Sequence, residues 1–204
     1  MQEQVIISGM GSISSMGSNA AEVWKNYSAQ TTRITSCCFN NCDTEVGKLH
    51  IEDDKLIKEI RKENLHFRRL DKTVLLSIFA ARQAVKQANW KAEDNMSVNL
   101  GSSRGATQLF EKYHKNFLEN SNKRLSPVVS PTTTLGNISS WVAYDLGTKG
   151  ASFSHSITCS TALHSVLNGI AWLQAGMAEK FITGGAEAPL SDFTIAQMRA
   201  LRIY

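Results

Sequence analysis

The feature that most constrains the fold is the junction between a strand-like and a helix-like segment at residues 151–176. Apolar and small polar residues alternate over residues 151–157 with a period of two, which predicts a strand. Apolar residues then recur at spacings of three and four, which predicts one stripe of an amphipathic helix. This stripe comprises Ala162, Leu163, Val166, Leu167, Ile170 and Leu173. Thr158 is the expected N-cap of the helix, and Gly176 is the expected residue just past its end.

Cys159 lies between these two segments. A thiol at that position would sit over the unpaired N–H groups of the helix and the positive end of its dipole. Both favour the thiolate, which is the nucleophilic form of cysteine. The alternative is that Cys159 packs as a small apolar residue, as single cysteines often do. The local pattern alone leaves both interpretations open.

Strand-like and helix-like segments alternate along the rest of the chain. Further strands are expected at residues 5–8, 97–101 and 180–183. Helices are expected from residue 19 or 20, and over 71–89, 108–119 and 134–145. Residues 31–54 read as irregular, and the segment between Pro127 and Pro131 as extended. This order predicts an α/β fold with a mostly parallel sheet and helices on its faces. Because no Pro/Gly/Ser-rich linker divides the chain, a single domain spanning residues 1–204 is expected.

Charge and hydropathy exclude several classes of protein. The 204 residues carry a formal net charge of +4, which is compatible with an acidic partner. The charges are dispersed, without the aromatic-studded basic stripe of a nucleic-acid binder. No apolar run reaches the roughly eighteen residues that a transmembrane helix needs. The N-terminus also lacks the pattern of a signal peptide. We therefore expect a cytoplasmic protein that binds neither nucleic acid nor membrane.

The cysteines and glycines suggest neither a metal nor a cofactor. Cys37, Cys38 and Cys42 cluster ahead of His50, but their spacing lacks the paired Cys-x-x-Cys pattern of structural zinc. Free thiols in a reducing compartment are therefore expected there. Residues 9–14 come close to a dinucleotide-binding fingerprint. They lack its third glycine, and no acidic residue follows about twenty positions on.

Several segments, in order, resemble one known family. The segments are residues 5–11 (VIISGMG), 68–72 (RRLDK), 126–137, 145–150 (DLGTKG), 157–164 (ITCSTALH) and 181–188 (FITGGAEA). Together the chain resembles the N-terminal half of a β-ketoacyl-[acyl-carrier-protein] synthase of the thiolase-like superfamily. The resemblance implies one α-β-α half of a five-layered α-β-α-β-α fold, with a mixed, mostly parallel sheet.

The resemblance also implies a reaction. Cys159 would accept an acyl group from a thioester, and a malonyl thioester would then decarboxylate and attack that acyl group. The product would belong to fatty acid or polyketide synthesis, and the reaction needs no cofactor. The backbone N–H of Cys159 would be the first oxyanion donor. His164 lies at i+5 from the cysteine, about 140° further round a helix, so we expect it to be structural or supporting. Glu187 is a second candidate supporting residue.

The chain departs from the family pattern in sequence and in extent. Thr158 stands where the family commonly has alanine, and Ala151 stands where proline often occurs. The family's two catalytic histidines and its other half-sheet would follow Leu201, so the C-terminal half is absent. We therefore expect no condensation by this chain alone, and an uncovered apolar face with open sheet edges. A homodimer that pairs strands near residues 151–157 would cover one of those edges.

The resemblance implies that the chain binds an acidic partner, the acyl carrier protein. Arg61, Lys62, Arg68 and Arg69 are the candidate docking charges, although each could simply be a solvated surface charge. An alternative function is that of a catalytically incomplete partner, which binds acyl chains or dimerises without condensing them. A thiolase-like degradative enzyme is disfavoured by the ordered synthase segments.

Overall fold

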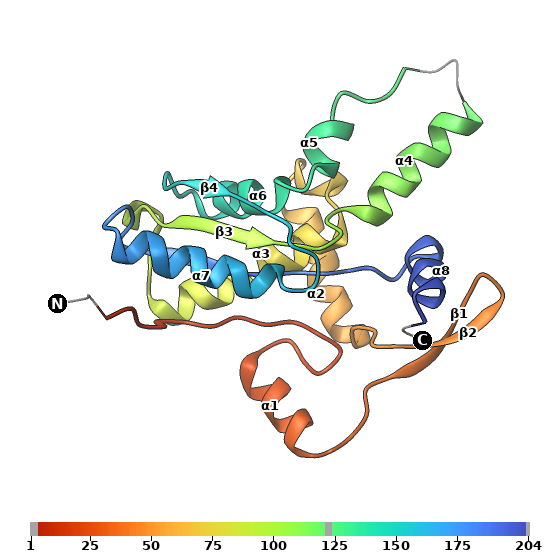
Figure 1. Cartoon of the computed structure of the whole chain (residues 1–204), viewed down its shortest axis with the longest axis horizontal. Coiled ribbons are helices and arrows are strands. Elements are labelled where there is room, and N and C mark those ends of the chain that lie inside the picture. The colour runs from red at the N-terminus through yellow and green to blue at the C-terminus, as the bar shows by residue number, and fades with distance from the viewer. Residues whose placement is uncertain (1–3, 121–123, 203–204) are drawn as a thin grey trace.

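The computed structural model describes residues 4–120 and 124–202 (Figure 1). Its centre is a three-stranded parallel sheet with the strand order β4-β3-β5. The strands are β3 (Ser97–Gly101), β4 (Ser152–Phe153) and β5 (Phe181–Gly185). Helix α7 (Thr161–Gln174) packs on one face, and α3 (Lys72–Ala88) and α6 (Asn137–Leu146) pack on the other. The predicted α/β fold with a parallel sheet is confirmed.

The main core lies between the sheet and the helices α3 and α6. Val98, Leu100 and Ile182 project from the sheet into the same cluster as the buried side chains of α3 and α6. The side chain of Asp71 caps α3 by accepting a hydrogen bond from the N–H of Thr73 at 2.8 Å. The observed helix lies within the predicted range 71–89, because a wide apolar face and good caps specify it locally.

Helix α7 meets the sheet through small residues. Thr161, Ser165 and Gly169 face the sheet and are buried. The first part of the predicted apolar stripe lies on the outer side, where Leu163 and Leu167 are 71% and 60% exposed, whereas Ile170 and Leu173 are half-buried. Small side chains let a helix approach a sheet closely, whereas large ones would hold it away. The expectation of an uncovered apolar face is therefore met by α7.

Smaller elements surround this centre (Figure 1). They are α1 (Ala20–Ser28), β1 (Thr35–Phe39), β2 (Cys42–Val46), α2 (Ile51–Glu63), the 3₁₀ turns η1 (Phe67–Arg69) and η2 (Ala92–Asp94), α4 (Thr107–Glu119), α5 (Val129–Thr133) and α8 (Asp192–Ala200). Strands β1 and β2 form an antiparallel hairpin. The hairpin contacts α8 through its turn, where the N–H of Asn40 donates to the carboxylate of Asp192 at 3.1 Å, and through β2, where Arg199 donates to the hydroxyl of Thr44 at 2.7 Å.

The buried strand predicted at residues 5–8 is wrong. This segment forms no ladder with the described strands, and Ile6 and Ile7 are 73% and 81% exposed. Strands β3 and β5 pair directly with each other. The segment that follows lies against α3 instead: a Cβ added at Gly9 would stand 2.2 Å from the carbonyl oxygen of Ala84. An apolar run without a pairing partner remains extended and unpaired.

Three further predictions were wrong in part. Residues 31–54 contain the β1–β2 hairpin and the first turn of α2 rather than irregular chain. The segment between Pro127 and Pro131 includes the start of α5, in which Pro131 occupies an early position that needs no intrahelical donor. The strand expected over 151–157 shortens to Ser152–Phe153, because the chain leaves the sheet to form the turn before α7.

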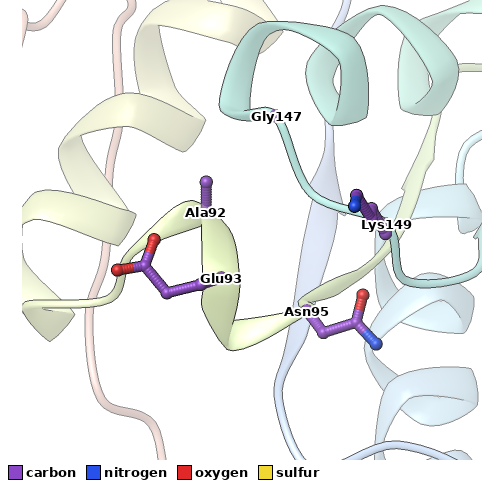
Figure 2. Close-up of a pocket in the computed structure, with 5 residues that line it drawn as sticks. All are labelled: Ala92, Glu93, Asn95, Gly147 and Lys149. Carbon is purple, nitrogen blue, oxygen red and sulfur yellow. The ribbon is translucent and has the colours of Figure 1, made fainter.

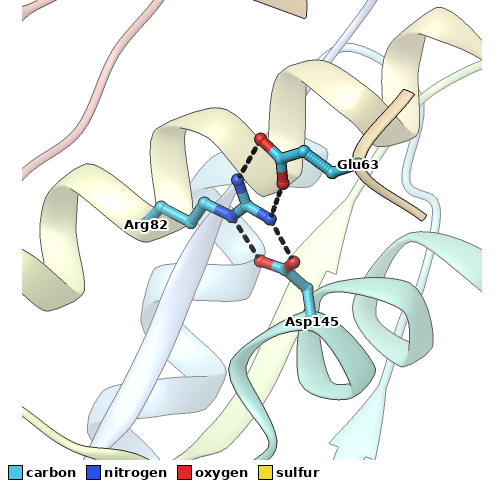
Figure 3. A network of polar contacts seen from close by, with 3 residues as sticks. All are labelled: Glu63, Arg82 and Asp145. Atoms are coloured by element: carbon cyan, nitrogen blue, oxygen red, sulfur yellow. Dashed lines mark hydrogen bonds and ion pairs between the residues drawn. The ribbon is translucent and has the colours of Figure 1, made fainter. Parts of the chain in front are cut away.

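One arginine ties three helices together behind the sheet (Figure 3). Arg82 of α3 donates to Asp145 of α6 at 2.6 and 2.8 Å and to Glu63 at the end of α2 at 2.7 and 3.2 Å. Hydrogen bonds to Asp145 and then to Glu63 raise the pKa of Arg82 above its usual value. The guanidinium therefore stays charged, and this network fixes the positions of α2 and α6 on α3.

Candidate active site

The candidate site lies at the carboxyl ends of β3 and β5, where both strands end in glycine. Gly101 and Gly185 are paired across the two strands. A Cβ added at Gly101 would stand 2.1 Å from the Cγ2 atom of Thr161, and one at Gly185 would stand 2.9 Å from the Cβ atom of Ala162. Neither distance allows a side chain at these strand ends. The two glycines therefore let the first turn of α7 rest directly on the sheet.

The turn before α7 has an unusual backbone. Thr158 has φ = +47°, a left-handed conformation that β-branched residues rarely adopt. The hydroxyl of Thr161 closes this turn, because it donates to the carbonyl oxygen of Thr158 at 2.6 Å and accepts from the N–H of Ile157 at 2.8 Å. The hydroxyl of Ser160 adds a bond to the carbonyl oxygen of Ile157 at 3.0 Å. These bonds stabilise a conformation that would otherwise cost about 1–3 kcal/mol.

Cys159 occupies the middle of this turn and is exposed. The expectation that Thr158 caps the helix is wrong: the N-cap is Ser160, and Thr158 is used for the left-handed turn instead. Gly176 ends the helix as predicted, with φ = +68°. The thiol of Cys159 therefore stands just ahead of the amino end of a fourteen-residue helix and is open to a reactant.

His164 and Glu187 form hydrogen bonds near the turn and the strand ends. The Nδ1 atom of His164 lies 3.0 Å from the carbonyl oxygen of Ser160, to which it donates in the matching tautomer. The carboxylate of Glu187 accepts a hydrogen bond from the N–H of Ser103. His164 thus binds the turn that holds the cysteine, and Glu187 joins the loops that follow β5 and β3.

The four basic candidates separate into two groups. Arg61 is half-buried, and its guanidinium donates to the carbonyl oxygens of Leu70 at 2.7 Å and Arg68 at 3.3 Å. Burial lowers the pKa of Arg61. Lys62 forms an ion pair with Glu59 at 2.7 Å. Arg68 and Arg69 lie exposed on η1 and form no ion pair with any described residue.

The cysteine cluster lies away from this site, on the β1–β2 hairpin. Cys37 and Cys38 belong to β1, Cys42 begins β2, and all three are free thiols. Cys38 and Cys42 are exposed. They are useful as internal references for the reactivity of Cys159.

The surface of the described residues is hollowed in more than one place. One hollow of about 570 Å³ is lined by Ala92, Glu93, Asn95, Gly147 and Lys149 (Figure 2). Its residues come from the segments just before β3 and just before β4. The hollow therefore lies at the amino ends of the parallel strands. Sites in open α/β sheets lie at the carboxyl ends of the strands. This hollow is therefore not the candidate active site.

Another hollow is a groove of about 700 Å³ beside the outer edge of β5. It is lined by the extended segment 7–13, by α1 and α3, and by residues 182–187, which include Glu187. Sequence reasoning did not predict this groove, because it exists only when the segment 7–13 lies outside the sheet.

Sequence reasoning also missed Thr161, Gly101 and Gly185. A signal was present in the two strands that each end in a glycine turn. Its meaning depends on the distance between each strand end and α7, which the sequence does not show.

Comparison with solved structures defines the class of fold. The structure titled "The ishigamide ketosynthase/chain length factor" superposes with a TM-score of 0.84 at 18% sequence identity, over 98% of this chain and 51% of that one. A type II PKS acyl-carrier protein in complex with its ketosynthase, AntDE:AntF, matches with a TM-score of 0.74 at 16% identity, over 98% of this chain and 49% of that one. The fold is therefore that of the thiolase-like ketosynthases.

Sequence comparison then identifies the family. The profile described as "Beta-ketoacyl synthase, N-terminal domain" matches residues 2–204, so the chain belongs to the β-ketoacyl synthase family. The 3-oxoacyl-[acyl-carrier-protein] synthase 2 of Staphylococcus aureus (strain COL) is 31% identical over 98% of this chain and 49% of its own length. Nodulation protein E of Rhizobium leguminosarum bv. trifolii is 24% identical over 100% of this chain and 51% of its own. The chain spans about half the length of these curated relatives.

None of the helices in the described part of the chain is long and apolar enough to cross a membrane.

Proposed function

We propose that this chain supplies the nucleophile-bearing part of a β-ketoacyl-[acyl-carrier-protein] synthase, an acyltransferase, and that Cys159 is the nucleophile. The observation that carries the proposal is the exposed thiol on a tightly bonded turn, ahead of α7 and at the carboxyl ends of the parallel strands. Membership of the β-ketoacyl synthase family supports the same chemistry.

The proposed step is acyl transfer. The thiolate of Cys159 attacks the carbonyl carbon of an acyl thioester, and the oxygen bears the negative charge. In the described part of the chain, the N–H groups of Ser160 and Thr161 donate to carbonyl oxygens within the turn, whereas the N–H of Cys159 donates to none. It is therefore available to the oxyanion. The carbon–sulfur bond of the donor thioester then breaks, and its thiolate leaves and takes up a proton.

The second half-reaction would join this acyl group to the carbanion from a malonyl thioester, with loss of carbon dioxide. The product would belong to fatty acid or polyketide synthesis, in the cytoplasm. His164 and Glu187 would support the turn and the adjoining loops rather than transfer protons. For this chain alone, the proposal is limited to acyl transfer.

Intact-mass measurement after incubation with an acyl thioester tests the nucleophile. The mass of the wild-type chain should increase by one acyl group. A Cys42→Ala variant, which lacks a thiol on the hairpin, should show the same increase. The Cys159→Ala variant should show no such increase. A shift of the same size in Cys159→Ala would refute the assignment.

The acidic carrier protein is the proposed donor of the acyl group. Arg68 and Arg69 are the proposed docking charges, because they are exposed and form no ion pair with a described residue. The solved ketosynthase in complex with its carrier protein supports a partner of this kind. Arg61 is a weaker candidate because its guanidinium holds η1, and Lys62 is already paired with Glu59.

A charge-reversal experiment tests this docking surface. Arg68→Glu/Arg69→Glu should abolish measurable binding of an acyl carrier protein at low salt, because it reverses the attraction. Lys112→Glu/Lys115→Glu on α4 makes the same change in net charge elsewhere and should weaken binding much less. Equal weakening by both double variants would contradict a localised docking site.

The alternative function is that of a catalytically incomplete acyl-binding or dimerisation partner. The exposed apolar stripe of α7 favours it, because such a face requires a cover. A chain that self-associates through this stripe but accepts no acyl group on Cys159 would support this alternative. A homodimer is compatible with either function.

A further inference from the structure

Thr161 is the buried residue most directly connected to the turn that carries Cys159. Only 3% of its surface is exposed. Its hydroxyl donates a hydrogen bond to the carbonyl oxygen of Thr158, the strained residue, and accepts one from the N–H of Ile157, the residue before it. Its methyl group faces the bare strand end at Gly101. One side chain thus bonds to the turn and packs against the sheet.

The two halves of this side chain have separable tasks. The methyl group fills the space left by the absent side chain of Gly101, which positions the first turn of α7. The hydroxyl bonds to the N–H of Ile157 and the carbonyl oxygen of Thr158 at part-buried positions, and without these bonds the turn would favour a different backbone conformation. Without the hydroxyl, the left-handed conformation of Thr158 loses the bonds that offset its strain.

We propose that Thr161 is a positioning residue for Cys159: its hydroxyl holds the left-handed turn that presents the thiol ahead of α7. This inference rests on the proposed role of Cys159 as the nucleophile. Thr161 itself does not touch the reactant. Its contribution is to keep the thiol and the N–H of Cys159 in fixed positions relative to the amino end of the helix.

Two substitutions separate the hydroxyl from the methyl group. Thr161→Val keeps the branched shape and removes the hydroxyl, whereas Thr161→Ser keeps the hydroxyl and removes the methyl group. Ser165→Ala is the matched control. It also removes a buried hydroxyl from the sheet-facing side of α7, but the bonds of Ser165 go to Gly184 and Ala162 rather than to the turn.

The experiment measures, at several pH values, the rate at which iodoacetamide alkylates Cys159. Peptide mass mapping reports the alkylation of each cysteine separately, so that the other three thiols serve as internal references. Thr161→Val should lower the rate of Cys159 alkylation by about tenfold relative to the reference thiols, because the thiol loses its fixed position ahead of α7. Thr161→Ser should retain a near wild-type profile. Ser165→Ala should leave the profile unchanged even if it lowers stability.

Different outcomes test the inference and the proposed function separately. Equal profiles for Thr161→Val and wild type, or an equal loss in Thr161→Val and Ser165→Ala, would overturn the positioning role. Failure of wild-type Cys159 to accept an acyl group would overturn the proposed function while leaving the alkylation result intact. If Thr161→Val does not fold, a lowered rate in Thr161→Ser overturns the inference and an unchanged one supports it.

Discussion

The backbone of Thr158 is held in a left-handed conformation in the turn that carries Cys159. Among the described residues with positive φ other than glycine, it is the one with a β-branched side chain. The others are Gln30, Asn40, Asn41, Asn89, Asn95 and Arg202. Asparagine tolerates this conformation because its side chain can bond locally, whereas threonine is crowded in it. The surrounding hydrogen bonds of Thr161 and Ser160 keep Thr158 there.

Replacing Thr158 should therefore relieve strain. We expect Thr158→Asn to raise the free energy of unfolding by about 1 kcal/mol, because asparagine adopts positive φ more readily. Thr134→Asn is the control, since Thr134 is exposed with φ = −68° and should change little. Urea denaturation measures both. A destabilised Thr158→Asn would show that the threonine side chain contributes contacts that outweigh its backbone strain.

The sequence indicates some of the candidate site residues and misses others for a physical reason. Cys159 follows from the local order of strand, cysteine and helix, which the structure retains, whereas His164 comes from the resemblance to the family motif. Thr161 could not be found this way, because its role depends on which backbone atoms of the turn face its hydroxyl. Arg61 appeared to be a surface charge, and only the fold brings it to the carbonyl oxygens of η1.

At the scale of elements, periodicity succeeded where a segment carries its own signal. Helix α3 has caps and a broad apolar face, and β3 appears with the predicted bounds Ser97–Gly101. The segment 5–8 has the composition of a strand but lacks a partner in the sheet. The β1–β2 hairpin carries few apolar residues, and α8 holds its turn through contacts more than 150 positions away in the chain.

The strand-end glycines give a sharp test of the packing between β3 and α7. Gly101→Ala should lower the free energy of unfolding by about 2 kcal/mol, because its Cβ would overlap Thr161 and force α7 away. Gly136→Ala is the control, since no atom lies within 4 Å of its added Cβ and its φ is −70°. Denaturant titration distinguishes them. Equal stability of the two variants would contradict the close packing of α7 on the sheet.

The pH dependence of stability should reveal the contact between α2 and the start of α3. A hydrogen bond from Lys72, at 2.6 Å, lowers the pKa of Asp54 from its usual 3.8. A carboxyl with a depressed folded-state pKa adds stability above its unfolded pKa, and loses it as pH falls through the folded value.

Replacement of Asp54 isolates this contribution. At pH 7, Asp54→Asn should be less stable than wild type by about 1 kcal/mol or less, because the pair is partly exposed. The difference should shrink as pH falls below 3.8, where the wild-type carboxyl also becomes neutral. Thermal denaturation over this range measures it. A difference that does not depend on pH would assign the effect to something other than this charge.

At the scale of the whole molecule, the outer face of α7 is the most conspicuous feature without a cover. Leu163, Val166 and Leu167 are exposed on it beside the turn of Cys159. Strand β4 is also the outer strand at one side of the sheet. Within the described residues these surfaces are uncovered, and exposed apolar faces and open sheet edges favour association.

Self-association should follow from this exposed stripe. At micromolar concentration, light scattering should give the mass of a dimer or a larger assembly. Leu163→Glu/Leu167→Glu should shift the mass toward that of a monomer, because charge on the stripe opposes burial. Phe117→Glu/Leu118→Glu on α4 is the control and should not. A wild-type monomer would argue against both the homodimer and the role of the stripe.

Among the four free cysteines of the chain, we propose that Cys159 alone is placed by the fold to accept an acyl group. Site-resolved peptide mapping after a brief exposure to an acyl thioester at neutral pH tests this claim most directly. We expect the acyl group to appear on Cys159 well before it appears on the exposed Cys38 and Cys42. Equal acylation of the three thiols, or faster acylation on the hairpin, would contradict it.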